Sequence, residues 1–233
     1  MTSEADVIDL YYWPTPNGWK ISIMLEECGL PYALHKINIG RGEQFEPQFL
    51  TISPNNRIPA IVDPSGPDGK PISVFESGAI LQYLARKTGR FYGSSERVAI
   101  EEWLFWQMGG LGPMSGQANH FRNYAPEKVE YGINRYTNEV NRLYGVMNRR
   151  LEDREYLAGP YSIADIACVG WTRAWKRMGQ EISDFPHLAR WLDAVLARPA
   201  VQKGIDAGMQ DHPPTDLAKD KEAQAILFNQ RAR

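Results

Sequence analysis

The stretch from residue 7 to residue 29 constrains the fold more than any other part of the chain. Its first seven residues, VIDLYYW, are mostly apolar and predict a buried strand. The apolar residues of its second half have the i, i+3, i+4, i+7 spacing of one helix face: Ile21, Met24, Leu25 and Cys28. Gly29 suits the end of that helix. Strand and helix are joined only by the turn Pro14-Thr15-Pro16-Asn17-Gly18, and so tight a turn is a good place for chemistry.

Five further segments complete an α/β pattern. The sequence predicts strands at 32–39, 57–63 and 71–75, a short irregular helix at 43–53, and a helix over 76–89. The connection between the first two strands is a βαβ crossover, so these strands should be parallel. The loop PSGPDGK suits a hairpin between the last two strands. The order β-α-β-α-β-β-α predicts a thioredoxin-like α/β domain.

From about residue 97 every segment has a helical pattern. A glycine-proline cluster at 109–114 predicts a break or kink, and Ser162-Ile163-Ala164-Asp165 has the form of a capping box. The tail contains an apolar cluster at 226–228, which fits a docked short helix or a frayed terminus. The predicted organisation is therefore a thioredoxin-like domain at 1–89, a linker at 90–96, an all-helical domain at 97–211 and a tail at 212–233.

The composition argues against several classes of protein. A net charge of -2 lacks the basic excess of a nucleic-acid binder. The start, MTSEADVIDL, has neither the basic nor the apolar region of a secretory signal. No apolar run approaches the length of a membrane span. We therefore expect a soluble, cytoplasmic protein without nucleic-acid or membrane partners.

The thiols and imidazoles of the chain do not form a recognisable centre. Cys28 and Cys168 both lie on apolar helical faces, which is typical of reduced packing residues. The four histidines are scattered and form no metal-binding motif. We expect no metal, and any thiol chemistry must use a sulfur brought in from outside.

Thr15 and Asn17 are the residues of the first turn that could take part in chemistry. Neither is a nucleophile at neutral pH without a base, but both can donate hydrogen bonds. They precede or open a helix, whose N-terminus adds free N–H groups and a positive partial charge. Donors there stabilise an anion, and the sensible anion is the thiolate of a ligand. The alternative is that Thr15 and Asn17 only cap the helix.

A thioredoxin-like domain followed by a helical domain resembles the cytosolic glutathione transferases, over residues 7 to 208. Three motifs carry the resemblance: Asn56-Arg57-Ile58-Pro59-Ala60, Glu76-Ser77-Gly78-Ala79-Ile80 and Ser162-Ile163-Ala164-Asp165. The longer stretches PTPNG, GEQF, SPNNRIPAIVD and LFWQMGGLGPMSGQANHF are similar to the nu-class, Ure2p-like members. The resemblance implies a homodimer that binds two glutathione molecules, or one glutathione disulfide, in each site.

The resemblance also implies roles for individual residues. The Ile58–Pro59 bond should be cis, which exposes the Ile58 backbone to an extended peptide. Ser77, at a helix N-terminus, would bind the γ-glutamyl carboxylate, and Glu76 the γ-glutamyl ammonium. Each residue has a plainer alternative, since Ser77 also suits a helix cap.

Three more polar residues are weaker candidates. Gln44 and Arg57 could bind the glycyl carboxylate, but Gln44 could equally be a surface polar residue and Arg57 a solvated charge. Arg135, in the helical domain, could lie near the second glutathione across a dimer interface, or form a surface salt bridge instead.

Three functions are compatible with these residues. The first is a disulfide oxidoreductase that uses glutathione as co-substrate and no protein cysteine. The second is a transferase that adds glutathione to electrophiles or reduces organic peroxides with it. The third is a non-catalytic regulator on the same scaffold. The regulators among similar proteins carry a disordered Asn/Gln-rich N-terminal extension, whereas here the first strand should begin near residue 7.

Overall fold

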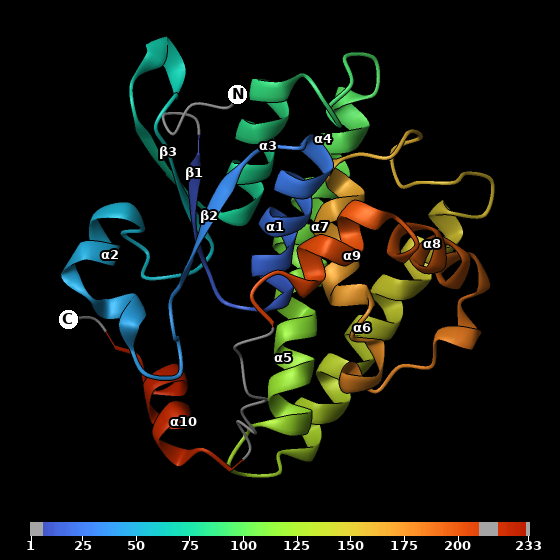
Figure 1. Ribbon diagram of the computed structural model, residues 1–233. Helices are drawn as coiled ribbons and strands as arrows, with labels where there is room; N and C mark the ends of the chain where they lie inside the picture. The colour runs from blue at the N-terminus through green and yellow to red at the C-terminus, as the bar shows by residue number, and fades with distance from the viewer. Residues whose placement is uncertain (1–6, 210–218, 232–233) are drawn as a thin grey trace. The chain divides into compact units, whose positions relative to one another are not determined.

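The computed structural model describes residues 7–209 and 219–231 of the 233-residue chain (Figure 1). The described residues form two compact units. The first comprises residues 7–84 together with residues 200–209 and 219–231, and the second comprises residues 85–199. The predicted domain limits remain a prediction.

The first unit is built on a four-stranded mixed sheet with the order β2-β1-β3-β4. Its strands are β1 (Ile8–Tyr12), β2 (Tyr32–Lys36), β3 (Ala60–Asp63) and β4 (Ile72–Phe75). Strands β1 and β2 are parallel, as predicted, and β3 is antiparallel to both β1 and β4. The predicted order βαβαββα is confirmed. The strands are shorter than the predicted ranges, because hydrogen-bonded pairing with neighbouring strands covers only part of each apolar run.

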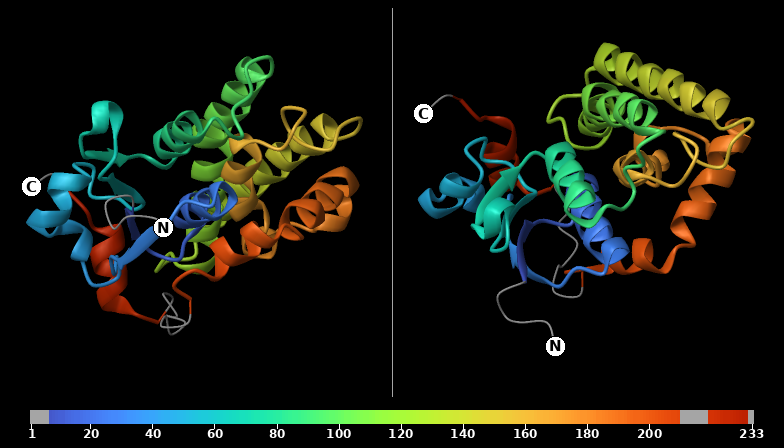
Figure 2. Two further views of the ribbon diagram at one scale, coloured as in Figure 1. Left: turned by 45° about the horizontal axis from the view of Figure 1, so that its top comes forward. Right: turned by 90° about the horizontal axis from the view of Figure 1, so that it is seen from above.

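Three helices cover the two faces of this sheet. They are α1 (Pro16–Cys28), α2 (Pro47–Ile52) and α3 (Ser77–Thr88); a 3-10 turn η2 (Glu43–Phe45) precedes α2, and another, η3 (Pro67–Gly69), joins β3 to β4. Helices α1 and α3 lie on one face and α2 lies on the other (Figures 1 and 2). Alternate residues of β1 are fully buried, whereas Tyr11 between them contacts Phe49 of α2 with 6.1 Å between ring centroids. The end of β1 therefore delivers the chain directly to the N-terminus of α1.

Two later helices also belong to the first unit, α9 (Pro199–Asp206) and α10 (Lys221–Phe228). Helix α9 lies close against α1, where the Ser22 hydroxyl donates a 2.6 Å hydrogen bond to the Gly204 carbonyl oxygen. A Cβ atom at Gly204 would come within 2.5 Å of the Ile23 backbone, so only glycine allows this approach. The apolar cluster at 226–228 is part of α10, and the docked-helix interpretation of the tail is correct.

The second unit is helical throughout, as predicted. Its elements are α4 (Arg97–Trp106), η4 (Gln107–Leu111), α5 (Gly112–Asn123), α6 (Glu130–Arg150), α7 (Ile163–Thr172), η5 (Trp175–Met178), η6 (Ile182–Asp184) and α8 (Pro186–Leu196). The predicted kink is a single wide π-helical turn, η4, which joins α4 to α5. Helix α7 packs against α4, α5 and α8 and is buried along almost its whole length.

The predicted capping box opens α7. The Ser162 hydroxyl accepts a hydrogen bond from the Ala164 N–H, and the Asp165 carboxylate accepts one from the Ser162 N–H. Across the described parts of the chain, no helix is long and apolar enough to cross a membrane.

Candidate functional site

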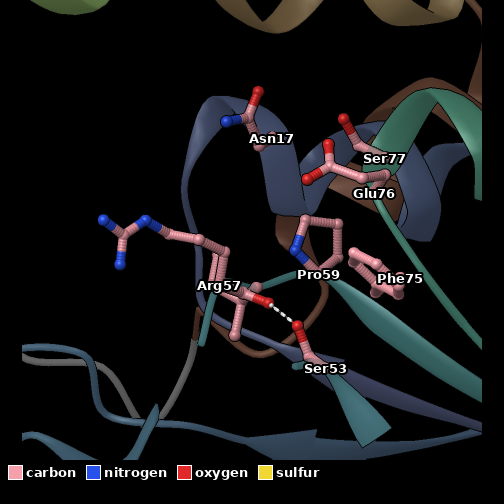
Figure 3. A pocket seen from close by; sticks show the side chains of 8 residues that line it. Asn17, Ser53, Arg57, Pro59, Phe75, Glu76 and Ser77 are labelled. Carbon is pink, nitrogen blue, oxygen red and sulfur yellow. Dashed lines mark hydrogen bonds between the residues drawn. The ribbon is translucent and has the colours of Figure 1, made fainter. Parts of the chain in front are cut away.

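A pocket lies in the first unit, where the start of α1, the segment before β3 and the turn from β4 into α3 come together (Figure 3). Five of the predicted site residues line it, although they come from segments up to 60 positions apart: Asn17, Arg57, Ile58, Glu76 and Ser77. Its remaining walls are formed by Ser53, Pro59 and Phe75. No thiol or imidazole is among these lining residues, so the chemistry of the pocket depends on hydrogen bonds and charge.

Thr15 is the N-cap of α1. Its side-chain oxygen accepts a hydrogen bond of 3.2 Å from the Gly18 N–H, so the capping interpretation is correct for this residue. Capping does not exclude the second role, because a hydroxyl has one donor proton besides its acceptor lone pairs. Within residues 7–209 and 219–231 the Thr15 hydroxyl has no other hydrogen-bond partner. Its proton is therefore available to an anion placed at the end of α1.

Asn17 is the second residue of α1, and its side chain lies on the pocket side (Figure 3). The next residue, Gly18, makes the turn possible. A Cβ atom there would lie 2.2 Å from the Trp13 carbonyl oxygen and 2.8 Å from the Tyr12 ring. Only glycine at position 18 allows α1 to begin so soon after β1. The Asn-Gly pair therefore places the Asn17 amide in the first turn of this helix.

The segment before β3 supplies the cis peptide bond. The Ile58–Pro59 bond is cis, as the resemblance implies. The Ser53 hydroxyl donates a 2.8 Å hydrogen bond to the Arg57 carbonyl oxygen and fixes the approach to this bond (Figure 3). Ser53 is fully buried, so its hydroxyl is held in place by the surrounding protein. The backbone of Ile58 is thereby held in a fixed position at the pocket wall.

Glu76 and Ser77 form the turn from β4 into α3. Glu76 has a φ of 69°, a left-handed conformation that costs a residue with a side chain about 1–3 kcal/mol and often marks a functional site. Its carboxylate is exposed and accepts a 3.2 Å hydrogen bond from the Asn55 amide. Ser77, the first residue of α3, is nearly buried. An exposed carboxylate and a helix N-terminus therefore stand next to each other, which suits a ligand that carries both an ammonium and a carboxylate.

Lys20 contacts the pocket residue Ser77 from behind, and the sequence interpretation missed it. Its side chain is only 2% exposed, and its ammonium group donates a 3.2 Å hydrogen bond to the Ser77 hydroxyl. A buried ammonium group next to the N-terminus of α3 raises the positive potential at that end of the pocket. The signal was present in the sequence, since Lys20 follows Asn17 by three residues and so shares its side of α1.

Gln44 does not line the pocket, and the surface interpretation of this residue is wrong. It is 1% exposed because η2 turns its side chain inward, where the amide N–H donates to the Ile39 carbonyl oxygen at 3.2 Å. Its side-chain oxygen is buried and has no hydrogen-bond partner among the described residues. Such an acceptor is costly to leave unpaired.

Arg57 reaches the rim of the pocket, and its guanidinium points away from Glu76 and Ser77 (Figure 3). One nitrogen, Nη1, donates to the Asn56 side chain and carbonyl at 3.2 Å each and to the Gln230 side-chain oxygen at 2.7 Å. The residue is exposed, yet it is engaged by the protein, so the solvated-charge interpretation is incomplete.

Arg135 lies in α6, in the second unit, and does not line this pocket. It is exposed, one turn before Glu139. The pKa of Glu139 is lowered chiefly by the hydrogen bond from Arg142, with a small contribution from the charge of Arg135. Elsewhere in the described ranges, no group of three or more His, Cys, Asp or Glu residues could hold a metal ion.

The family follows from comparison with known domains. The N-terminal domain of glutathione S-transferases matches residues 15–87, and their C-terminal domain matches residues 116–199. The chain belongs to the glutathione transferase family. The predicted resemblance is confirmed, and the pocket lies within the matched N-terminal domain.

Individual relatives match most of the chain. The disulfide-bond oxidoreductase YfcG of Escherichia coli is 53% identical over 203 residues, which cover 85% of this chain and 94% of the relative. A Pseudomonas putida glutathione transferase, solved with one glutathione disulfide per subunit, has 44% identity and a TM-score of 0.83, covering 89% of this chain and 94% of that one. A Burkholderia graminis transferase, solved with two glutathione molecules per subunit, has 46% identity and a TM-score of 0.83, covering 89% and 90%.

Proposed function

We propose that the protein is a glutathione-dependent disulfide oxidoreductase. The observation that carries the proposal is the pocket itself, which places Asn17 at the start of α1, with the Thr15 cap directly before it, and contains no protein thiol. A thioredoxin-like fold that does thiol chemistry without its own sulfur needs a ligand sulfur. The name of the Escherichia coli relative and the bound ligands of the solved relatives support glutathione as that ligand.

The donors at α1 make the glutathione sulfur reactive by favouring its thiolate. A hydrogen bond to a charged group contributes about 1.5–3 kcal/mol, and one pKa unit corresponds to about 1.4 kcal/mol. Two donors, from Thr15 and Asn17, are enough to bring a thiol of pKa about 8.5 to near neutrality. The glutathione thiol loses its proton to solvent on binding, and the thiolate remains hydrogen-bonded at the helix end.

Disulfide reduction then takes two exchange steps. The bound thiolate attacks one sulfur of the substrate disulfide, forms a glutathione–substrate mixed disulfide and expels the other sulfur as a thiolate, which takes a proton from water. A second glutathione thiolate attacks the glutathionyl sulfur, forms glutathione disulfide and expels the second substrate thiolate. Two glutathione molecules supply the two electrons, and no sulfur of the protein changes its oxidation state.

The rest of the pocket binds the peptide. Ser77 and the N-terminus of α3 bind the γ-glutamyl carboxylate, with Lys20 behind them, and Glu76 binds the ammonium. The Ile58 backbone pairs with the cysteinyl residue. Gln44 and Arg57 serve the glycyl end, and Arg135 serves the second glutathione across a dimer interface.

The same thiolate supports a second activity, transfer of glutathione to an electrophile or reduction of an organic peroxide. The family to which the chain belongs favours this alternative. Comparing turnover of a small disulfide with that of an aryl halide separates the two, since only the acceptor differs. We place the protein in the cytoplasm, where glutathione is kept largely reduced and can act as electron donor.

Replacing both cysteines, as in Cys28→Ser combined with Cys168→Ala, is expected to leave glutathione-dependent disulfide reduction within about twofold of the wild-type rate. Neither residue lines the pocket, and Cys168 is fully buried in α7. The measurement is turnover of a small disulfide with glutathione, coupled to reduction of the glutathione disulfide formed. Loss of activity in Cys28→Ser alone, with the fold intact, would contradict the proposed mechanism.

We further propose that the protein is a homodimer that uses the face formed by α4 and α6. Phe105 is 63% exposed there, beside a groove that it lines together with Trp106, Met114, Leu143 and the Glu139–Arg142 ion pair. An exposed aromatic group next to an apolar groove lets two copies insert this group into each other's groove about a two-fold axis. Glu139 and Arg142, which pair with each other at the edge of the groove, can instead pair with Arg142 and Glu139 of a second copy.

Phe105→Glu is accordingly expected to raise the dimer dissociation constant by about tenfold or more, since buried aromatic anchors dominate such interfaces. Sedimentation velocity over a range of protein concentrations measures it. Val98→Glu is the control, because Val98 is also exposed on α4 but does not line the groove. Equal effects of the two variants, or a wild-type monomer, would exclude this face.

A further inference from the structure

Helix α10 packs on the loop that follows β2. Ala223 of α10 is only 1% exposed. A Cβ atom built on Gly40 would lie 3.4 Å from the Ala223 side chain, and one on Gly42 would lie 3.8 Å from Ile226. Helix α10 therefore lies directly against the loop that leads to Gln44, and Figure 1 shows it near α2. This helix lies beyond residue 199, where the match to the family's C-terminal domain ends.

Charged contacts add to this packing. Arg41 forms a close ion pair with Glu222 and a longer one of 3.9 Å with Asp220. The Arg41 side chain is 54% exposed, so these pairs contribute less than the burial of Ala223.

Gln230, two residues after α10 ends, contacts the pocket through Arg57. Its side-chain oxygen accepts the 2.7 Å hydrogen bond from Arg57 Nη1, and its amide N–H donates to the Ile226 carbonyl oxygen at 3.3 Å. All the hydrogen bonds that the Arg57 guanidinium makes with the described residues use Nη1. Its Nε–Nη2 edge has no partner within the described part of the chain. That edge has the fork geometry that binds a carboxylate with two parallel hydrogen bonds.

We propose that α10 and Gln230 form the outer wall of the glycyl subsite and make the pocket selective for a peptide that ends in a glycyl carboxylate. The proposal rests on glutathione being the ligand. Gln230 acts as a positioning residue, because it holds one corner of the Arg57 guanidinium and leaves the carboxylate-binding edge unoccupied. Helix α10 holds the loop before Gln44, the other residue assigned to the glycyl end.

The physical gain is pre-organisation. A free arginine side chain samples many rotamers, and fixing it on a ligand costs conformational entropy. When Gln230 already fixes the Arg57 side chain, ligand binding no longer has to order that side chain. Affinity therefore rises for peptides long enough to reach Arg57. A peptide without the glycyl residue gains nothing from the same arrangement.

The test compares glutathione with γ-glutamylcysteine, which lacks the glycyl residue, by calorimetric titration of the full-length protein. Gln230→Ala is expected to raise the dissociation constant for glutathione about three- to tenfold and to leave that for γ-glutamylcysteine unchanged. Ala223→Glu, which places a charged side chain in a buried contact of α10, should have the same selective effect.

Asn229→Ala is the matched control, because Asn229 adjoins Gln230 but has an exposed side chain. A change of equal size for both peptides would show that α10 only stabilises the fold, and no change in Gln230→Ala would remove its role as a positioning residue. Failure of the wild-type protein to bind glutathione at all would overturn the proposed function, and this proposal with it.

Discussion

Thr15→Ala is expected to raise the pKa of the bound glutathione thiol by about one to two units and to slow disulfide reduction at neutral pH by about ten- to a hundredfold. The variant loses one hydrogen bond to the thiolate, worth about 1.5–3 kcal/mol, and each pKa unit corresponds to about 1.4 kcal/mol. The ultraviolet absorbance of the thiolate, followed against pH in the complex, gives the pKa directly.

The pH dependence separates this effect from a loss of binding. Because the defect lies in ionisation, the rate of Thr15→Ala should approach that of the wild type as the pH rises above the raised pKa. Affinity for S-methylglutathione, which has no thiol to ionise, should change little.

The cap of α1 must be controlled for, since the Thr15 oxygen also accepts the Gly18 N–H. Losing an N-cap costs about 1 kcal/mol of stability on its own. Thr15→Ser keeps both the cap and the donor proton and should retain the wild-type pKa. Asn17→Ala tests the second donor in the same way. If either alanine variant leaves both the pKa and the rate unchanged, that residue is only part of the cap.

The elements of the fold were predictable where a local pattern and the tertiary structure agree. The spacing from Ile21 to Cys28 placed α1, and the capping box placed the start of α7, because both depend on residues close in sequence. The cis bond at Pro59 was predictable only from the resemblance, since about 5–6% of X–Pro bonds in folded proteins are cis. Strand ends were less predictable, because they depend on pairing with distant residues.

The pocket residues could be predicted from sequence motifs but not from their chemical types alone. Glu76 and Ser77 together form a recognisable motif. Their proximity to Asn17 depends on the topology of the sheet. Lys20 was missed because a lysine usually indicates a solvated position, and this one is buried against Ser77. The inward turn of Gln44 and the contact of Arg57 with Gln230 depend on η2 and α10, whose packing no sequence period reveals.

Asp165→Ala is expected to lower the free energy of unfolding by about 3–5 kcal/mol, because each buried donor that loses its partner costs about 1–3 kcal/mol. The Asp165 carboxylate is fully buried and accepts hydrogen bonds from Leu157 N–H at 3.0 Å, Ser162 N–H at 3.0 Å and Trp191 Nε1–H at 2.8 Å. These three donors would lose their partner inside the second unit. Urea denaturation measures the loss. Asp193→Ala, at an exposed position of α8, is the control.

The protonation of Asp165 makes part of this stability depend on pH. Burial raises the pKa of the Asp165 carboxyl from an ordinary value of 3.8 to about 6. The hydrogen bonds to this carboxyl act in the opposite direction and lower its pKa, but burial has the larger effect. The folded chain therefore binds the proton more tightly than the unfolded chain, so the contribution of this group is greatest below about pH 4 and is lost as the pH rises through 6. Asp165→Asn keeps one acceptor oxygen and does not titrate. The difference in unfolding free energy between wild type and Asp165→Asn should accordingly narrow from pH 4 to pH 6 and stay level above it. A difference that does not narrow over this interval would mean that the hydrogen bonds to the carboxylate outweigh burial and hold it ionised.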